Sequence, residues 1–318
     1  MKSRVAALCT CLLLATPATA SDLLNIASPQ RGSWEGAIPE LGKEQGIFQK
    51  HGLDLDILYT AGGGETLQAV ISGAVDVGLS AGTLGVMGAF AKNAPIRIIG
   101  ASSTGSRELF WYVRASSALK SLRDAPEGTT IAYSTIGAST HIAVLRFIAD
   151  YGLKARPVAT GDISATTTQA MSGQVDVGWS VAPFNLDPLA KGEIRLVARA
   201  SDIARIRGQT IRVQIANLGA LAQKRDAIAR YLAAYRETLD WMYASPEAVA
   251  RYVAFSKLPE SAVRRMLAEF IPKESLQVDR VVGTQESMQD AIQFKFLAAP
   301  LSTAQLQELI RIAPSGAQ

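Results

Sequence analysis

Two tryptophans are the residues of this sequence best suited to holding the body of a small organic molecule. Trp34 follows Ser33 in a polar segment, and Trp179 alternates with Val177 in a short apolar run. An indole ring offers a large, rigid surface, so two rings facing one cavity would suit an aromatic, heterocyclic or alkyl ligand. Core burial is the alternative, and for Trp179 both interpretations stay open. For Trp34 we expect binding, so that Trp34→Ala weakens binding with little loss of folding stability.

Four hydroxyl side chains could complement these rings. Ser80, Thr83, Ser139 and Thr140 can each donate a hydrogen bond to a ligand oxygen. The last two stand at the start of a predicted helix, where backbone N–H groups are free. Simple N-capping is the alternative, and both roles can hold at once.

Three consecutive glycines, Gly62 to Gly64, precede a predicted short helix that ends at Gly73. Glycines let the backbone approach a bound group closely, and the free N–H groups of the helix start can bind an anion. A flexible turn is the alternative. The run lacks the Lys-Ser/Thr pair of a phosphate-binding loop, so nucleotide binding is not indicated.

Charged residues offer few further candidates. Arg31 and Arg107 are the arginines that we consider for a carboxylate or sulfonate, because a guanidinium matches such groups. His51 and His141 are too far apart in sequence to indicate a metal site. We therefore expect no metal and no cofactor.

A repeated segment must position these side chains. Residues 72–80 (SGAVDVGLS) return as residues 172–180 (SGQVDVGWS), 100 positions later, and each copy predicts a helix end, a tight turn and a short strand that ends on serine. The chain therefore contains two related α/β units, whose strands carry ligand sites at their carboxyl ends. Asp76 and Asp176 look catalytic, but an aspartate in such a turn accepts backbone N–H bonds, so we interpret both as structural.

The two ends of the chain indicate which class of protein this is. Residues 1–20 predict a cleaved secretory signal that contains both cysteines, so the mature chain has no disulfide and no thiol chemistry. Loss of Lys2 and Arg4 lowers the formal net charge from +4 to about +2, without a basic cluster for nucleic acid. No other segment is apolar enough to cross a membrane, so we expect a soluble, exported monomer without stable membrane insertion. From Gln223 onward the pattern is helical, and these helices should pack on the first unit.

With these elements in order, the sequence resembles the solute receptors of the sulfonate/taurine, nitrate and thiamine-precursor ABC importers, which are class II periplasmic binding proteins. The resemblance runs from Asn25 to about Asn217, and its marks are residues 44–48, 51–53, 62–64, 72–78, 119–124, 130–132, 137–140 and 151–153. It implies an α/β fold of two lobes joined by two crossovers, with a C-terminal helical segment on lobe one. The implied parts are a signal peptide at 1–20, lobe one at 21–107 and 214–318, and lobe two at 108–213.

The resemblance also implies a ligand site on the loops that follow the strands. The implied contacts are Gln30, Arg31, Ser33, Trp34, Gly63, Gly64, Glu65, Thr66, Ser80, Ala81, Gly82, Thr83, Ser134, Gly137, Ser139, Thr140 and Trp179. The family more often carries a small or aromatic residue near the first loop, where this chain has Pro29 to Trp34. A sulfonate or nitrate ligand therefore does not carry over.

These observations lead to one functional hypothesis and two alternatives. The hypothesis is a periplasmic receptor that closes on a small solute of the sulfonate, aromatic or heterocyclic anion class and delivers it to an ABC permease with its ATPase. One alternative is an enzyme on the same fold, similar to the pyrimidine synthases, although those carry cysteines and act inside cells. The other alternative is a ligand-sensing input protein for a receptor kinase. A neighbouring permease gene would favour import, and a kinase gene would favour sensing.

Overall fold

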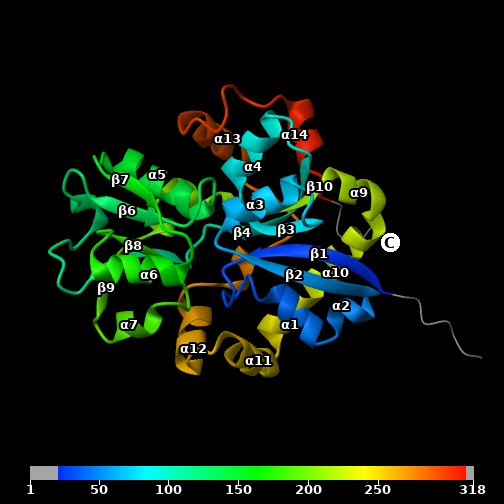
Figure 1. Cartoon of the computed structure of the whole chain (residues 1–318), viewed down its shortest axis with the longest axis horizontal. Coiled ribbons are helices and arrows are strands. Elements are labelled where there is room, and N and C mark those ends of the chain that lie inside the picture. The colour runs from blue at the N-terminus through cyan, green and yellow to red at the C-terminus, as the bar shows by residue number, and fades with distance from the viewer. Residues whose placement is uncertain (1–20, 313–318) are drawn as a thin grey trace, which may run out of the picture.

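Two α/β lobes lie side by side in the computed structural model, which describes residues 21–312 (Figure 1). The predicted signal peptide lies outside the described residues. Lobe one contains a five-stranded sheet, and lobe two contains a three-stranded and a two-stranded sheet. The chain crosses from the first sheet to lobe two after residue 104, and it returns before residue 210.

The sheet of lobe one has the strand order β2-β1-β3-β10-β4. β1 pairs in parallel with β2 and β3, and β10 runs antiparallel between β3 and β4. The strands are β1 (Asp22–Pro29), β2 (Leu53–Thr60), β3 (Val77–Gly82), β4 (Ile96–Thr104) and β10 (Thr210–Asn217). The first helices are α1 (Ile38–Glu44), α2 (Ile47–Lys50), α3 (Gly63–Ile71) and α4 (Thr83–Ala91).

Lobe two is built on a shorter version of the same plan. Its sheets have the orders β8-β5-β9 and β6-β7. The strands are β5 (Leu109–Arg114), β6 (Thr130–Tyr133), β7 (Arg156–Ala159), β8 (Gly178–Val181) and β9 (Ile194–Arg199). The helices are α5 (Ser139–Tyr151), α6 (Ile163–Ser172), α7 (Leu186–Ala190) and α8 (Ala204–Arg207).

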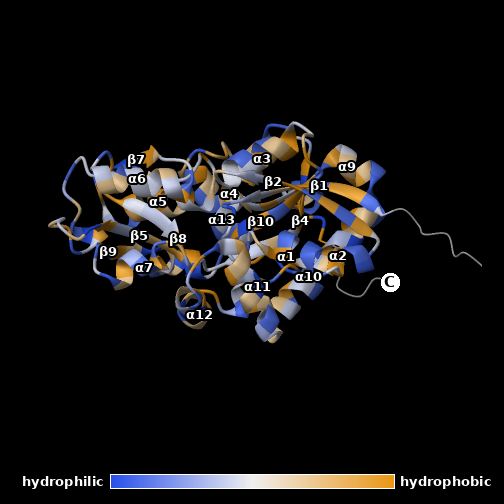
Figure 2. Cartoon of the chain, turned by 60° about the horizontal axis from the view of Figure 1, so that its bottom comes forward, coloured by the Kyte–Doolittle hydropathy of each residue, from blue (hydrophilic) through white to orange (hydrophobic). Residues whose placement is uncertain are grey.

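Helices follow the return to lobe one, as the sequence predicted. They are α9 (Leu218–Gln223), α10 (Arg225–Ala244), α11 (Pro246–Ser256), α12 (Glu260–Glu269), α13 (Thr284–Gln293) and α14 (Thr303–Leu309). α10 packs on α1 and α2, α13 packs on α4, and α14 contacts β4. In Figure 2 the outer helices alternate between orange and blue, as expected for helices that bury one face. Within residues 21–312, no helix combines the length and hydropathy needed to span a bilayer.

Two expectations about the elements need correction. The sequence predicts one helix through Ile38, Leu41 and Phe48, which share a face, and ending before Gly52. The structure breaks this helix into α1 and α2, because Gly46 between them has a φ of +79°, which ends a right-handed helix. The lobe boundary expected between residues 213 and 214 falls inside β10. The whole of β10 lies in the sheet of lobe one, because it pairs with β4 from Thr210 onward.

The two copies of the 100-residue repeat make equivalent hydrogen bonds, which confirms the repeat. Oδ2 of Asp76 accepts the backbone N–H of Asn25 at 2.9 Å, and Oδ2 of Asp176 accepts the backbone N–H of Thr130 at 2.8 Å. Each aspartate thereby ties the turn before one strand to a neighbouring strand, β1 in lobe one and β6 in lobe two. Neither aspartate lines the cavity described below. The structural interpretation of both aspartates is therefore confirmed.

We expect Asp76→Ala to lower the free energy of unfolding by roughly 1–3 kcal/mol, because the part-buried N–H of Asn25 loses its partner. Lys224 Nζ, 2.8 Å from Oδ2 of Asp76, also loses its counter-ion. Urea denaturation would measure the loss, and Asp176→Ala in lobe two is the matched variant. Ligand affinity should stay within about twofold, since affinity follows contacts at the site. A large affinity loss with unchanged stability would contradict this role.

Candidate functional site

A cavity of about 40 Å³ lies between the two lobes and at the crossover that joins them. By that measure it has room for about three water molecules. The lobes are in contact beside it, since the N–H of Gly64 in lobe one donates to Oγ1 of Thr135 in lobe two at 3.1 Å. The wall from lobe one and the crossover comprises Pro29, Gln30, Ser33, Trp34, Glu35, Gly62, Gly63, Ser80, Glu108, Arg212, Ile271 and Leu276. The wall from lobe two comprises Leu109, Ser134, Ala138, Ser139, Thr140, Trp179 and Val181.

Nine of the predicted site residues line this cavity. They are Gln30, Ser33, Trp34, Gly63, Ser80, Ser134, Ser139, Thr140 and Trp179. Two of them, Gln30 and Ser80, are non-glycine residues with φ values of 57° and 54°. Such backbone conformations are costly for residues other than glycine and gather at binding sites. These two backbone conformations are therefore a second indication that the cavity is a binding site.

Trp34 forms part of the wall and is fully buried. Its ring packs edge-on against Tyr252 at 4.7 Å and Tyr243 at 5.7 Å between ring centroids. The hydroxyl of Tyr252 donates to the carbonyl of Gly32 at 2.6 Å, which anchors the loop that carries Trp34 on α11. The expectation that Trp34→Ala spares folding stability is therefore wrong, because truncating a buried Trp costs about 3–5 kcal/mol.

Trp179 is both a wall residue and a strand residue. It lies on β8 opposite Trp111 of β5, and its side chain is 2 % exposed. Within residues 21–312 its indole N–H has no hydrogen-bond partner. A buried donor without a partner costs about 1–3 kcal/mol, so this N–H is suited to a ligand acceptor. Of the two interpretations left open by the sequence, the structure supports both together.

The hydroxyl residues of lobe two are organised around the start of α5. The Ser134 hydroxyl lies 2.8 Å from Oγ1 of Thr140, and the backbone N–H of Ser134 donates to the same atom at 3.0 Å. Ser139 also lines the cavity. The residue at the N-cap position is Ala138, which has no side-chain cap, so Ser139 and Thr140 are not N-caps.

Three ionisable side chains that the sequence did not predict form the polar part of the wall. The Nη2 atom of Arg212 lies 3.1 Å from Oε2 of Glu35 and also pairs with Oε1 of Glu108. The hydroxyl of Ser80 donates to Oε1 of Glu35 at 2.7 Å. All three ionisable side chains are at least nine-tenths buried. We call Glu35, Glu108 and Arg212 the buried ion cluster.

Burial and mutual attraction set the protonation of this cluster. Burial raises the pKa of Glu108, and the neighbouring Arg212 lowers it by less. Burial by itself lowers the pKa of Arg212, but the carboxylates of Glu35 and Glu108 more than offset this effect and raise it. Arg212 therefore stays charged, and Glu108 holds its charge less firmly than an exposed glutamate.

One sequence signal could have revealed the cluster. Arg212 and Gln214 interrupt the apolar centre of a strand that is buried from residue 210 to residue 216. A buried arginine requires a carboxylate partner. The signal does not say which carboxylate, because Glu108 stands 104 positions away from Arg212.

Five predicted residues close the lobes or pack the core and do not line the cavity. The N–H of Gly64 donates to Oγ1 of Thr135 at 3.1 Å, so the other lobe occupies the expected anion seat. A Cβ atom on Gly82 would lie 2.0 Å from the carbonyl oxygen of Gly137. We call this contact between lobes, made by Gly62, Gly64, Gly82, Gly85 and residues 134–138, the glycine seam. Ala81 lies beside it in the core, and Oγ1 of Thr83 donates to the carbonyl of Thr210 at 2.6 Å.

The remaining predicted residues have other partners. Arg31 lies over the rings of Tyr59 and Phe255 in an outer groove, and Arg107 is exposed. Oε2 of Glu65 accepts the N–H of Ala61 at 2.6 Å, and Oγ1 of Thr66 lies 2.7 Å from Oγ1 of Thr60. None of these four side chains lines the cavity.

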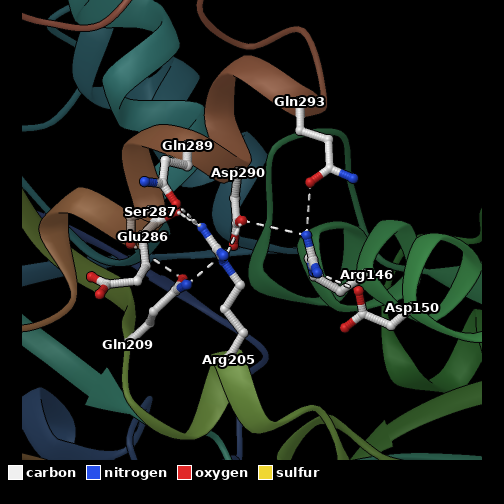
Figure 3. A network of polar contacts seen from close by, with 9 residues as sticks. All are labelled: Arg146, Asp150, Arg205, Gln209, Glu286, Ser287, Gln289, Asp290 and Gln293. Atoms are coloured by element: carbon white, nitrogen blue, oxygen red, sulfur yellow. Dashed lines mark hydrogen bonds and ion pairs between the residues drawn. The ribbon is translucent and has the colours of Figure 1, made fainter.

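A second contact between lobes lies at α13. Figure 3 shows Arg146 of α5 reaching Asp290 and Gln293 of α13, while Arg205 approaches Asp290 from α8. Arg205 Nε lies 2.6 Å from Oδ1 of Asp290, and Gln209 donates to Oδ2 at 3.1 Å. Together with the glycine seam, this network holds lobe two against lobe one.

His141 lies at the start of α5, stacked 4.3 Å from the ring of Tyr133, and its Nδ1 accepts the N–H of Gly137 at 3.2 Å. Burial lowers the pKa of His141 to about 4, from 6.5. The folded state thus favours neutral His141, and the stability that it contributes above pH 6.5 is lost as the pH falls toward about 4.

We therefore expect the melting temperature to fall over that pH range, and His141→Gln to flatten the fall. Thermal unfolding between pH 4 and 7 would measure it. Gln307→Asn, at an exposed residue of α14 that does not ionise, is the control and should keep the wild-type slope. Equal slopes in wild type and His141→Gln would contradict the role of His141.

Comparison with known proteins identifies relatives of this geometry. A family model described as NMT1/THI5 like matches residues 40–249. Among solved structures, the alkanesulfonate-binding protein SsuA from Xanthomonas axonopodis pv. citri, bound to MOPS, aligns with a TM-score of 0.77 at 19 % identity. The alignment covers 93 % of this chain and 100 % of that chain.

Two further solved structures share the fold. The periplasmic nitrate-binding protein NrtA from Synechocystis PCC 6803 aligns with a TM-score of 0.67 at 13 % identity, over 92 % of this chain and 86 % of that chain. The desulfurization enzyme DSZB aligns with a TM-score of 0.64 at 16 % identity, over 92 % and 97 %. Comparison with curated protein sequences gives no match. The expected fold, that of the periplasmic binding proteins, is confirmed.

Proposed function

Because the chain belongs to the NMT1/THI5-like family and has the periplasmic binding protein fold, we propose that it is the solute-binding protein of an ABC importer. The observation that carries the proposal is the cavity between the lobes, whose wall is shared by both lobes and the crossover. A ligand in that position contacts both lobes at once, so binding energy is available to hold them closed.

The lobes must open to admit a solute. The crossovers between them are the two segments that leave β4 and enter β10, and few residues need to change backbone angles in such a hinge. Closure then brings the glycine seam and the Arg146–Asp290 contact together. The closed form, as a monomer in the periplasm, would be the one that docks on a permease with its ATPase.

An enzymatic function finds little support at the cavity. Among the described residues that line it there is no histidine and no cysteine, although Ser80 and Ser139 offer hydroxyls. Ser80 donates to Glu35, which is itself paired with Arg212 and is therefore poorly placed to act as a base. The likeness to a desulfurization enzyme makes recovery of unaltered ligand part of the test.

A thermal-shift screen of the mature protein, refolded to remove carried-over ligand, tests the proposal. The panel contains alkyl and aromatic sulfonates, nitrate, aminopyrimidines, aromatic carboxylates and purines. We expect one class to raise the melting temperature, to be recovered unchanged and to reduce the radius of gyration in X-ray scattering. A hit that is consumed would favour an enzyme, and a hit without lobe closure would contradict the receptor.

The sequence favoured anions among these solutes, namely sulfonates or aromatic and heterocyclic anions. That class stays a prediction that the panel tests. The charges on the cavity wall argue for a different class.

A further inference from the structure

The ionisable groups on the cavity wall are two carboxylates and one guanidinium, those of Glu35, Glu108 and Arg212. When all three are ionised, the wall carries one negative charge in excess. No other ionisable side chain lines the cavity among the residues that the structure describes. The negative charge therefore has to be balanced by the ligand or by a proton.

The hydrogen bonds show which carboxylate is left incomplete. Both oxygens of Glu35 have a partner, because Oε1 accepts from Ser80 at 2.7 Å and Oε2 lies 3.1 Å from Nη2 of Arg212. Glu108 uses only Oε1, toward the same Nη2 atom. Its Oε2 atom is buried and has no partner within residues 21–312. An unpaired, buried carboxylate oxygen in a ligand cavity is a strong acceptor for a donor on the ligand.

We propose that the cavity selects a small nitrogen compound that presents a cationic or N–H-donating group to Oε2 of Glu108. This inference rests on the proposed function, because it names the ligand class of the same site. An amidine, a guanidine or a protonated amine has the required donors. An anion such as a sulfonate or nitrate does not.

The rest of the wall describes the remainder of this compound. Trp34 and Trp179 provide rings from opposite lobes, which suit a flat or compact apolar body and also favour a cation over their faces. Within residues 21–312, the unpaired donors of the wall residues are the indole N–H groups of Trp34 and Trp179 and Nε of Arg212. The compound should therefore also carry at least one acceptor atom, as a zwitterion or a heterocycle does.

The same charges oppose a simple anion. Arg212 already pairs with two carboxylates, so its charge is more than compensated. An anion brought into this cavity would add a second unbalanced negative charge in a buried place, which is costly. Protonation of Glu108 would relieve that cost and make Glu108 a donor, so the experiment must compare both charges of ligand directly.

The test uses matched compounds that differ in charge but hardly in shape and that suit a cavity with room for about three water molecules: acetamidinium, acetamide and acetate, with formamidinium and formate as a smaller pair. Dissociation constants are measured by calorimetry at pH 7.5 on wild type and on Glu108→Gln. In wild type we expect each amidinium to bind at least tenfold more tightly than its carboxylate. Glu108→Gln should weaken binding of the amidinium at least tenfold and leave the affinity for acetamide within about threefold.

Glu260→Gln is the charge-matched control, because Glu260 is exposed on α12, where it pairs only with Arg264 among the described residues. It should bind each compound as wild type does. The proposal is overturned if a carboxylate or methanesulfonate binds more tightly than the amidinium, or if Glu108→Gln leaves amidinium affinity unchanged. It is also overturned if neither amidinium binds at about 10 mM, where even weak ligands shift the melting temperature.

These outcomes separate the ligand class from the proposed function. An anion that binds tightly, closes the lobes and is recovered unchanged would contradict the proposed ligand class but support the receptor function. An amidine that binds through Glu108 but is consumed would support the ligand class but contradict the receptor function.

Discussion

Arg212→Met is expected to lower the free energy of unfolding by about 3–5 kcal/mol, because it leaves the buried carboxylates of Glu35 and Glu108 without their shared cation. In a protein of this size the loss corresponds to a fall in melting temperature on the order of 10 °C. Urea denaturation at pH 7.5 would measure it. Lowering the pH should restore part of the stability, because protonation removes the charges that Arg212 neutralised.

A triple variant separates the missing cation from lost packing. Glu35→Gln and Glu108→Gln, added to Arg212→Met, remove all three charges while keeping the volumes similar. We expect this variant to be more stable than Arg212→Met alone, since no unpaired charge remains buried. If Arg212→Met melts within about 2 °C of wild type, the ion cluster is not a structural element of the hinge region.

Gly82→Ala is expected to weaken ligand binding by about a hundredfold if it reduces the closed population to ~1 %. The added methyl would lie 2.0 Å from the carbonyl oxygen of Gly137 in the other lobe, and a backbone oxygen cannot move aside cheaply. Gly82 itself has a φ of −66°, so alanine fits its backbone in the open form. The melting temperature without ligand should therefore change little.

The measurement is the dissociation constant of the compound identified by the screen, together with X-ray scattering with and without it. Gly64→Ala should behave in the same way, because its methyl would lie 2.1 Å from the carbonyl oxygen of Ile136. Gly208→Ala is the control, since its Cβ atom meets nothing closer than 4.0 Å. Normal affinity and normal closure in Gly82→Ala would show that the seam is not needed for the closed form.

The glycine seam gives the glycine run a role that its sequence did not suggest. Glycines before a helix were interpreted as an anion seat or a flexible turn, since either use requires a bare backbone. The structure uses the bare backbone of Gly62 and Gly64 for contact with the hydroxyls of Ser134 and Thr135 on the opposite lobe. Glycine allows close contact with a ligand and equally with the other lobe. Only the tertiary structure shows which of the two contacts is made.

The elements themselves were largely predictable. The sequence pattern predicts strands at residues 23–28, 53–59 and 156–159, and β1, β2 and β7 lie within one residue of these ranges. Pro246 predicts the start of a helix, and α11 begins there. These elements follow from local patterns: alternation along a strand, and glycine or proline at the ends. The predicted single helix failed at Gly46, where one residue with positive φ outweighed the apolar spacing of Ile38, Leu41 and Phe48.

The candidate site was predictable only in part. Ser80 lies near the carboxyl end of β3 and Ser139 begins α5, and positions of this kind face the cavity. Glu35 and Glu108 carry no such local mark. Trp34 was predicted at the cavity, but its burial against Tyr243 and Tyr252 depends on α10 and α11, which lie more than 200 positions further along the chain.

By itself, the sequence of this protein determined its two related α/β units, the order of their elements and the structural role of Asp76 and Asp176. These properties depend on residues close together in the chain or on a repeat that can be read from it. Only the tertiary structure decided which polar groups meet in the cavity and which glycines close the lobes. Arg212 reaches Glu108 across 104 positions, and no local pattern encodes a partner at that distance.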